Sequence, residues 1–305
     1  MYNELMSSIL DRTTFSAARR RPRFKRFSPV PLRLTEDDLT ILRHVGEHRF
    51  LRSTHLVQLM NRSHDKIIRR LGALFHNGYL DRPAAQLDIL ARGGSAPLIY
   101  ALGNKGALFD GATSIDWTDK NRDVKRPYIE HALMVADFMI ALECGLRSNP
   151  DIKLVPARDI ARRAWTMTVT IPGGDTELSV TPDKVFALDF ANTGRRNYFL
   201  VEADRSTMPI ERPSLAQSSF KKKLLAYHHG HHINRHNVQW GIPGFRVLTI
   251  SKSEERVASM IATVKDITGG KGSNVFLFAD PVTADGSDPL KFRWISGKGK
   301  AVSLS

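Results

Sequence analysis

The sequence predicts a mixed α and β protein with two folded domains, which we place at residues 34–110 and 127–305. Three observations lead to this prediction. The chain has 305 residues, enough for about two compact units. Its first part shows short helical patterns followed by a hairpin pattern, whereas its second part alternates between strand and helix patterns. A polar stretch without periodicity, residues 111–126, lies between the two parts and is expected to be a linker.

The charge of the chain favours a polyanionic partner. The sequence holds 45 Lys and Arg residues against 31 Asp and Glu residues, which gives a formal net charge of +14. An excess of this size is typical of proteins that bind nucleic acid. A membrane is not expected, because the most apolar helical stretch, residues 132–146, contains Asp137 and Glu143.

Residues 1–33 are expected to form a flexible basic arm. Between residues 12 and 33 there are many basic residues and no acidic ones, and Pro22, Pro29 and Pro31 interrupt any helix. Such an arm either contacts phosphates beside a folded DNA-binding domain or serves only as a solubilising tail.

The first folded part has the element order of a winged helix-turn-helix. Helices are predicted at residues 35–48, 53–60 and 63–76 from apolar positions at helical spacing and from polar residues able to cap them. Strands are predicted at residues 79–82 and 98–102. Three short helices followed by a β-hairpin are the elements of this DNA-binding fold, in which the third helix enters the major groove.

The predicted third helix carries a basic face opposite its apolar one, as a helix in the major groove requires. The alternative is that these are ordinary solvated charges on a surface helix. The candidate DNA-binding residues are Lys66, Arg69 and Arg70 on this face, Arg62 and His64 at its start, Arg82 and Arg92 in the wing, and Arg19, Arg20, Arg21 and Arg23 in the arm.

The second folded part is expected to be an α/β domain with a mixed sheet. A short polar turn at residues 192–195 suggests that the strands on either side of it pair as a hairpin. Helices are predicted at about residues 127–147, 214–229 and 253–266, and strands at 153–156, 166–171, 184–190, 197–203, 246–250 and 274–278.

Four carboxylates gather in this predicted topology. Asp183 precedes one strand of the hairpin, Glu202 and Asp204 lie two positions apart at the end of the other, and Glu130 is expected to approach from the packed helix. Clustered carboxylates suit Mg²⁺, which polarises a phosphodiester and activates water. Asp183, Glu202, Asp204 and Glu130 are therefore candidate catalytic residues of a nuclease, with Asp183 and Glu202 as candidate metal ligands.

The spacing of Asp183 and Glu202 resembles that of the PD-(D/E)XK nucleases, also called restriction-endonuclease-like proteins. The resemblance implies a lysine two positions after the glutamate, where this chain has Asp204. A lysine could come instead from Lys184 or from one of the three consecutive lysines at 221–223. The alternative is that the carboxylates only pair with nearby arginines.

A longer set of residues resembles the replication-relaxation family over about residues 34–260. The resemblance implies a winged-helix protein of plasmids or other mobile elements that assists a replication initiator or a relaxase. The matching residues are 34–38, 50–51, 69–71, 74, 78–82, 100–103, 106–107, 130–131, 182–183 and 202–208.

The function predicted from these features is that of a DNA-binding accessory protein in replication initiation, DNA relaxation or mobilisation. Double-stranded DNA is the expected partner, with a relaxase or replication initiator as a second one, and no cofactor is needed for binding. One alternative is a magnesium-dependent endonuclease or nickase, and another is a winged-helix transcriptional repressor. The single cysteine and the lack of an apolar signal core predict a cytoplasmic location.

The dense histidines between residues 228 and 236 lack the spacing of a closed tetrahedral metal site, so a structural metal is not expected there.

Overall fold

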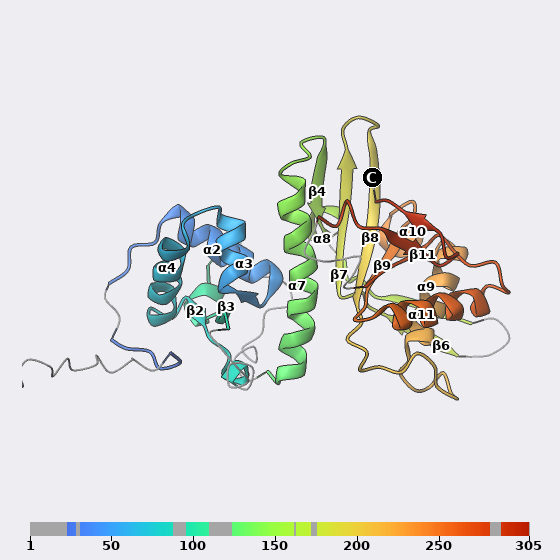
Figure 1. Ribbon diagram of the computed structural model, residues 1–305, viewed down its shortest axis with the longest axis horizontal. Helices are drawn as coiled ribbons and strands as arrows, with labels where there is room; N and C mark the ends of the chain where they lie inside the picture. Colours follow the sequence, from blue (N-terminus) through green and yellow to red (C-terminus); the bar gives the residue numbers. More distant parts are fainter. Residues whose placement is uncertain are drawn as a thin grey trace, which may run out of the picture.

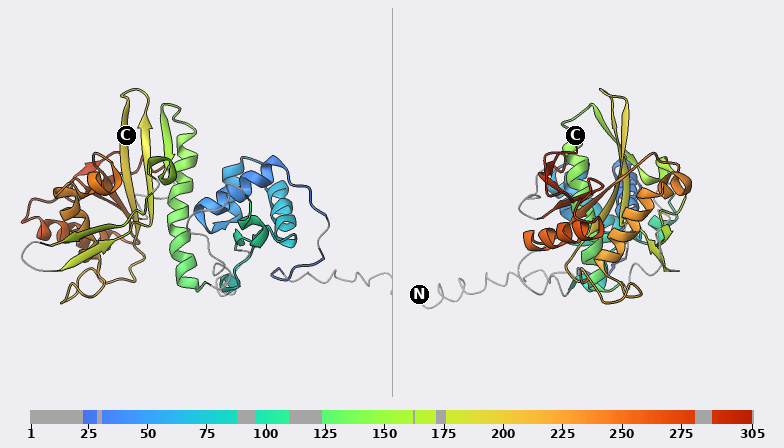
Figure 2. Two further views of the ribbon diagram at one scale, coloured as in Figure 1. Left: turned by 180° about the vertical axis from the view of Figure 1, so that it is seen from behind. Right: turned by 90° about the vertical axis from the view of Figure 1, so that its right-hand side faces the viewer.

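The computed structural model describes residues 23–28, 31–87, 96–109, 124–161, 163–171, 176–280 and 288–304. Helices and strands are mixed along this part of the chain, as predicted. One long helix, α7 (Arg126–Leu146), stands between a smaller group of elements and a larger one built on a sheet, and the view from behind shows the same arrangement (Figures 1 and 2). No described helix is long and apolar enough to cross a membrane.

Among the described residues, the smaller group, which we call the N-terminal group, contains three helices of more than one turn and a small antiparallel sheet. The helices lie close to their predicted positions. They are α2 (Glu36–His48), α3 (Ser53–Met60) and α4 (His64–His76). The strands, in the order β1-β3-β2, are β1 (Leu51–Arg52), β3 (Ile99–Leu102) and β2 (Leu80–Asp81). Two very short helices, η1 (Ala84–Gln86) and α6 (Asn104–Ala107), follow β2 and β3.

The start of α2 shows why the sequence folds in this way. The Thr35 side chain accepts a hydrogen bond from the Asp38 amide, and the Asp38 carboxylate accepts one from the Thr35 amide, which satisfies two amides that a helix leaves free. Apolar residues at helical spacing on α2, α3 and α4 then form one buried cluster, which includes Ile41, Leu56 and Leu71.

The larger group contains a mixed sheet with seven described strands. Its order is β12-β11-β10-β9-β8-β7-β4. The first three strands along the chain are antiparallel neighbours, and β9 and β10 then continue parallel to β8. The strands are β4 (Ile152–Pro156), β7 (Lys184–Phe190), β8 (Arg195–Ala203), β9 (Arg246–Ile250), β10 (Phe276–Ala279), β11 (Trp294–Ser296) and β12 (Ala301–Val302).

The predicted hairpin is present as β7 and β8, with Lys184 opposite Val201. A separate hairpin of β5 (Met167–Thr170) and β6 (Glu177–Val180) lies between β4 and β7 in the chain. The sequence pattern predicts β5 but not β6.

Helices cover both faces of the large sheet. On one face α9 (Phe220–His232) and α11 (Glu254–Ile267) pack against residues such as Leu200 and Phe276, and on the other face α7 packs against Phe199 and Leu277. The short helices α8 (Ala157–Ile160) and α10 (Arg235–Trp240) complete this group.

Helix α9 begins at Phe220 and not near residue 214 as predicted. The Ser219 side chain accepts a hydrogen bond from the Lys222 amide and so caps the helix there, whereas residues 214–219 are not helical.

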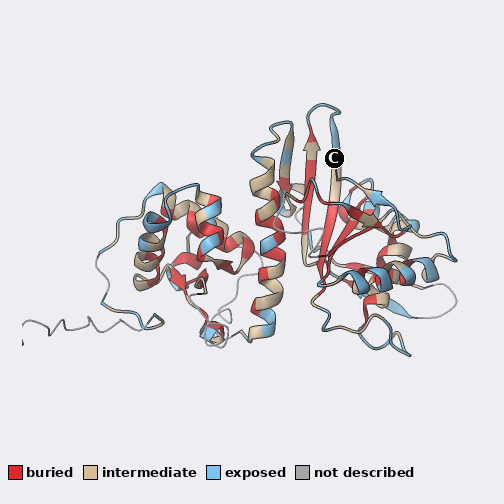
Figure 3. Cartoon of the chain, in the orientation of Figure 1, coloured by how far each residue is buried: buried red, intermediate tan, exposed pale blue. Residues whose placement is uncertain are grey.

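Buried, intermediate and exposed residues alternate along helix α7 (Figure 3). Ala136 and Ile140 belong to the core of the N-terminal group, whereas Phe138 and Met139 belong to the core of the large sheet. The one helix therefore contributes to both cores.

Part of the predicted basic arm packs against the N-terminal group. The Arg26 guanidinium donates hydrogen bonds to the carbonyls of Phe75 and Leu80 and forms an ion pair with Asp81. Residues 1–22 of the arm, residues 111–123 of the expected linker and residues 88–95 of the expected wing lie outside the described residues.

Candidate functional site

Helix α4 presents a basic outer face over the apolar one that it buries. Ile67, Leu71 and Leu74 are fully buried, while Lys66 and Arg69 are exposed. The side chain of Arg69 contacts only the Asp65 carbonyl of its own helix, at 3.3 Å, and makes no ion pair among the described residues. Arg69 is therefore available to an anionic ligand.

Two other basic residues of this region are exposed but have an acidic neighbour. The Lys66 ammonium lies 2.9 Å from one carboxylate oxygen of Asp37, and the Arg62 guanidinium lies 3.5 Å from the other. These bonds lower the pKa of Asp37, with the Lys66 hydrogen bond as the largest cause. Because both partners are half exposed, a phosphate can displace the carboxylate at little cost.

Arg70 has a different environment. Its Nε atom donates to Asp38 at 2.8 Å and its terminal nitrogen forms an ion pair with the same carboxylate, which is fully buried. Burial alone would raise the pKa of Asp38, but the hydrogen bonds from Arg70 and Thr35 lower it overall. Arg70 therefore holds α4 against the start of α2.

Arg82 also makes contacts within the N-terminal group. Its guanidinium lies 4.1 Å from the centre of the Phe75 ring, donates to the Tyr100 hydroxyl at 3.1 Å and donates to the Arg23 carbonyl. His64 is exposed and lies 3.2 Å from Asp65. Arg19, Arg20, Arg21 and Arg92, which sequence analysis also proposed, lie outside the described residues.

The second candidate site lies at the ends of β7 and β8, where the chain brings Asp183, Glu202 and Lys223 together. Glu202 is 1% exposed and sits at the end of β8. Its two carboxylate oxygens accept hydrogen bonds at 2.5 Å from the Lys223 ammonium and at 2.6 Å from the Tyr227 hydroxyl, both on α9. Of the lysines proposed from the sequence, Lys223 is the one that reaches Glu202.

The other proposed lysines lie elsewhere. Lys184 points to Glu47 of α2, with its ammonium 2.6 Å from a carboxylate oxygen, and Lys221 pairs with Asp266 at 2.8 Å.

Asp183 completes the pair of carboxylates. One of its oxygens accepts a hydrogen bond at 2.8 Å from the Ala203 amide, and the other lies 3.0 Å from the His131 ring of α7. Burial alone would raise the pKa of Asp183, but His131, Lys223 and the Ala203 amide lower it overall. Burial raises the pKa of Glu202 to about 7, with Lys223 opposing and the Asp183 carboxylate adding to the rise.

The other two proposed carboxylates have arginine partners. Asp204 accepts two hydrogen bonds of 2.9 Å from Arg256 and one of 3.1 Å from Ser251. Glu130 pairs with Arg126 at 2.6 Å and also with Arg205. These two carboxylates are held by ion pairs at the edge of the site, while Asp183 and Glu202 lie at its centre.

Two residues of the site, His131 and Tyr227, were not predicted from the sequence. His131 follows Glu130 directly, so its place on the same helix was a sequence clue. Tyr227 lies four positions after Lys223, the spacing that puts two side chains on one face of a helix, but only the packing of α9 on β8 shows that this face meets Glu202.

The profile of the family described as Replication-relaxation matches residues 42–237, more than half of the sequence. The chain belongs to the replication-relaxation family. Neither the curated proteins nor the solved structures include a match. For this replication-relaxation protein the matched region begins in α2 and ends in α10, so it includes α4 as well as Asp183, Glu202 and Lys223.

Proposed function

We propose that this protein is a DNA-binding accessory factor of a plasmid or another mobile element, which acts in replication initiation, DNA relaxation or mobilisation. Its N-terminal group would be a winged helix-turn-helix and its large sheet a separate domain. Family membership supports the process, and the order of α2, α3, α4 and the β2–β3 hairpin supports the DNA-binding fold. A relaxase or a replication initiator is the proposed protein partner.

The observation that carries this proposal is the outer face of α4. Arg69 is exposed and makes no ion pair among the described residues, and the half-exposed Lys66 and Arg62 lie on the same helix or just before it. A helix inserted in the major groove presents such a face to base edges and phosphates. The net charge of +14 adds long-range attraction to DNA.

The first test measures DNA affinity by fluorescence anisotropy across salt concentrations from about 50 to about 200 mM. The wild-type affinity is expected to fall steeply with salt. Arg69→Ala should weaken binding and, if Arg69 contacts a phosphate, should reduce the slope of log affinity against log salt by about 1.

Arg195→Ala is the matched control, because Arg195 is an exposed arginine at the start of β8, directly after the turn that follows β7. The proposal fails if Arg69→Ala and Arg195→Ala bind DNA equally well, or if the wild-type affinity does not respond to salt.

A second candidate function, metal-dependent cleavage of DNA, rests on the contact between Lys223 and Glu202. The strands β4, β7 and β8 run antiparallel and β9 continues parallel to β8, with a helix before and after them, which is the order we associate with the PD-(D/E)XK nucleases. The nuclease pattern has a lysine two positions after the glutamate, where this chain has Asp204. Here the ammonium of Lys223, from α9, lies beside Glu202 instead.

The carboxylates at this site fit a divalent cation. Mg²⁺ usually takes one or two protein carboxylates together with water and substrate phosphate. Burial is the main cause of the raised pKa of Glu202, and repulsion from the Asp183 carboxylate adds to it. A cation between the two carboxylates would relieve this repulsion. Asp183 and Glu202 would hold the metal, which when bound polarises a phosphodiester. Lys223 would place a positive charge beside the phosphate, and His131 orients Asp183.

The test of this second function is incubation of supercoiled plasmid with the protein, with and without Mg²⁺ or Mn²⁺. Nicking that needs metal and is lost in Asp183→Asn supports it. Asp189→Asn is the matched control, because Asp189 lies on β7, the strand that Asp183 directly precedes, but pairs with Arg196 on the surface. If the wild type binds DNA and leaves it intact under all these conditions, the second function is excluded and the first remains.

A further inference from the structure

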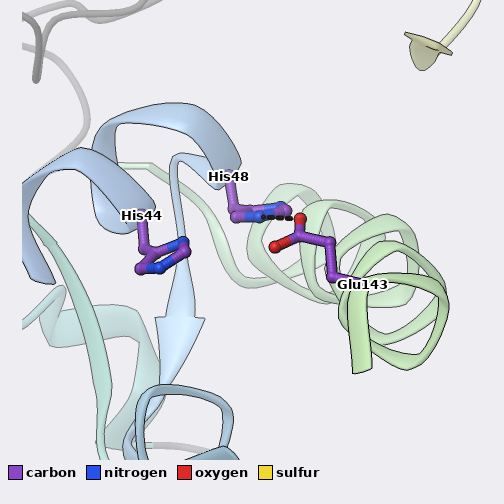
Figure 4. A group of neighbouring side chains, drawn as sticks. All are labelled: His44, His48 and Glu143. Atoms are coloured by element: carbon purple, nitrogen blue, oxygen red, sulfur yellow. Dashed lines mark hydrogen bonds and ion pairs between the residues drawn. The ribbon is translucent and has the colours of Figure 1, made fainter. Parts of the chain in front are cut away.

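Helix α2 and helix α7 bring two histidines and a glutamate together, away from both sites described above. His44 and His48 are four positions apart on α2 and so lie on one face, and Glu143 comes from α7 (Figure 4). The His48 Nε2 atom lies 3.1 Å from a Glu143 carboxylate oxygen. One ligand atom from each of the three residues lies within 4.8 Å of the other two, and this is the single such group among the residues that the structure describes.

We propose that His44, His48 and Glu143 bind a divalent transition-metal ion, with Zn²⁺ as the best match, and that this ion joins α2 to α7. Nothing in the proposed DNA-binding or nuclease function requires this site, so it stands apart from them.

The chemistry of the three donors favours zinc. Two imidazole nitrogens and one carboxylate oxygen form a known zinc ligand set, with the fourth position of the tetrahedron open to water. Bonds of about 2.0–2.1 Å place tetrahedral ligands about 3.3–3.5 Å apart. The pair of His48 and Glu143 already has nearly this separation, and the ligand atom of His44 lies within 4.8 Å of both, so metal binding would draw it closer.

The surroundings of His44 and Glu143 favour the forms of these two side chains that bind metal. Burial lowers the pKa of His44, so its imidazole is neutral near pH 7. Burial alone would raise the pKa of Glu143, but its hydrogen bond to His48 and the nearby histidines lower it overall, so it is a carboxylate. The positive charge of Arg147 is directed at the end of α3, where it donates to the carbonyls of Gln58 and Leu59.

The carboxylate of Glu47, which directly precedes His48, already has two basic partners. Its carboxylate accepts a hydrogen bond from Lys184 at 2.6 Å and pairs with Arg158. The spacing His-x-x-Glu-His occurs in a class of zinc peptidases, where the glutamate is the general base, but Glu47 held by two cations cannot take a proton from water. The site therefore stabilises the contact between α2 and α7 and performs no hydrolysis.

The consequence of binding is mechanical. α2 belongs to the N-terminal group and α7 packs on the large sheet, so an ion shared between them fixes the orientation of one group on the other. Because the ion binds the folded chain with both helices in contact, it also raises the thermal stability.

The experiment uses the full chain without an affinity tag, stripped of metal by a chelator. Zn²⁺ is titrated in competition with a chromogenic chelator, Co²⁺ is added separately to record its visible absorption, and Tm is measured with and without Zn²⁺. The variants are His44→Gln, His48→Gln and Glu143→Gln. The controls are His64→Gln, which removes an exposed histidine at the start of α4, and His231→Gln, which alters the histidine-rich end of α9.

The expected result is about one Zn²⁺ bound per wild-type chain, with a tetrahedral Co²⁺ spectrum and a rise in Tm. Each of the three variants should lose at least tenfold in Zn²⁺ affinity together with the rise in Tm, while both controls behave as wild type. Far-UV circular dichroism verifies that each variant is folded. The Glu143→Gln side chain can still accept a hydrogen bond from His48, so this variant keeps the test valid if a histidine variant unfolds.

Two results overturn the proposal. One is an unchanged Zn²⁺ affinity in a folded Glu143→Gln or His44→Gln variant. The other is loss of zinc binding in His231→Gln alone, which would place the metal among the histidines of α9.

Discussion

The carboxylate of Asp38 gives Arg70 a structural role. From the sequence, Arg70 belongs with Lys66 and Arg69 on a basic face that we expect to contact DNA. In the structure its guanidinium is bound to a fully buried carboxylate, while Arg69 remains without an acidic partner among the described residues. A buried carboxylate that loses its partner charge is costly, so this pair holds α4 to α2.

Asp38→Asn should therefore destabilise the protein by about 2–3 kcal/mol, below the full cost of a buried ion pair because the Arg70 side chain is 26% exposed. Asp37→Asn, at the preceding position, should cost at most about 1 kcal/mol because the Lys66 and Arg62 side chains that pair with Asp37 are half exposed. Urea denaturation measures both. Equal losses in the two variants would contradict a structural role for Asp38.

Glu202 makes the stability depend on pH. Its pKa is raised from 4.5 to about 7 in the folded chain, so the folded state holds a proton more tightly than the unfolded state. The stability that this tighter proton binding adds to the folded state is fully present below pH 4.5 and is lost as the pH rises through 7. The wild type should therefore lose stability relative to Glu202→Gln across this window, by on the order of 3 kcal/mol.

Glu130→Gln is the control for this measurement. The pKa of Glu130 is lowered, since the hydrogen bond from Arg126 and the charge of Arg205 outweigh burial, so its contribution does not decline between pH 4.5 and 7. Denaturation curves at several pH values compare the three proteins. A constant difference between wild type and Glu202→Gln would show that Glu202 is ionised throughout.

Among the elements, the connection from β3 to α6 contains Gly103 and Gly106, two of the residues that resemble the replication-relaxation family. The structure shows why both are glycine. A Cβ atom at Gly106 would lie 2.1 Å from the Tyr79 carbonyl oxygen, and one at Gly103 would lie 2.4 Å from the Gly78 carbonyl oxygen. Both contacts are with backbone, so no side chain can move aside. Close packing of α6 on the β2 segment requires glycine at both positions.

Gly106→Ala should destabilise the chain by about 2 kcal/mol or more. Gly72→Ala is the opposite case, because a Cβ atom at this helical position of α4 meets nothing within 4 Å. It should stabilise the protein by about 0.5–1 kcal/mol, since alanine favours the helix and narrows the unfolded ensemble. Thermal and urea unfolding of both variants measure whether each substitution lowers or raises the stability. An unchanged stability of Gly106→Ala would contradict the requirement for glycine at this position.

At the scale of the whole molecule, α7 connects the two groups of elements. It contributes Ile140 to the core of the N-terminal group and Phe138 to the core of the large sheet. Ion pairs add to this contact, among them Lys184 with Glu47. Because a helix cannot rotate to release one side without disturbing the other, we expect the two groups to unfold together.

Ile140→Ala should destabilise the protein by about 2–5 kcal/mol, whereas Ile233→Ala, at an exposed isoleucine, should cost less than about 1 kcal/mol. Trp165, Trp240 and Trp294 all lie beyond α7 in the chain. In a Trp117→Phe background their fluorescence reports on the large sheet alone. If the groups unfold together, Ile140→Ala shifts the fluorescence and far-UV transitions equally, and a shift of the far-UV transition only would show independent unfolding.

The sequence by itself determined most of the local structure. Caps such as Thr35 and apolar spacing placed α2, α3, α4 and α7, and a polar turn predicted the β7–β8 hairpin, because these features act between residues close in the chain. Very short strands such as β1 were not predicted, since two residues carry no periodicity and β1 depends on pairing with β3.

Only the tertiary structure decided which charged residues have which partners. Glu202 and Asp183 were candidates from sequence, but the choice of Lys223 over Lys184 and Lys221 depends on how α9 packs on the sheet. In the same way, the helical spacing of His44 and His48 is visible in the sequence, while Glu143 joins them from a helix far along the chain. Long-range partners depend on packing geometry, and a pattern along the chain does not contain that geometry.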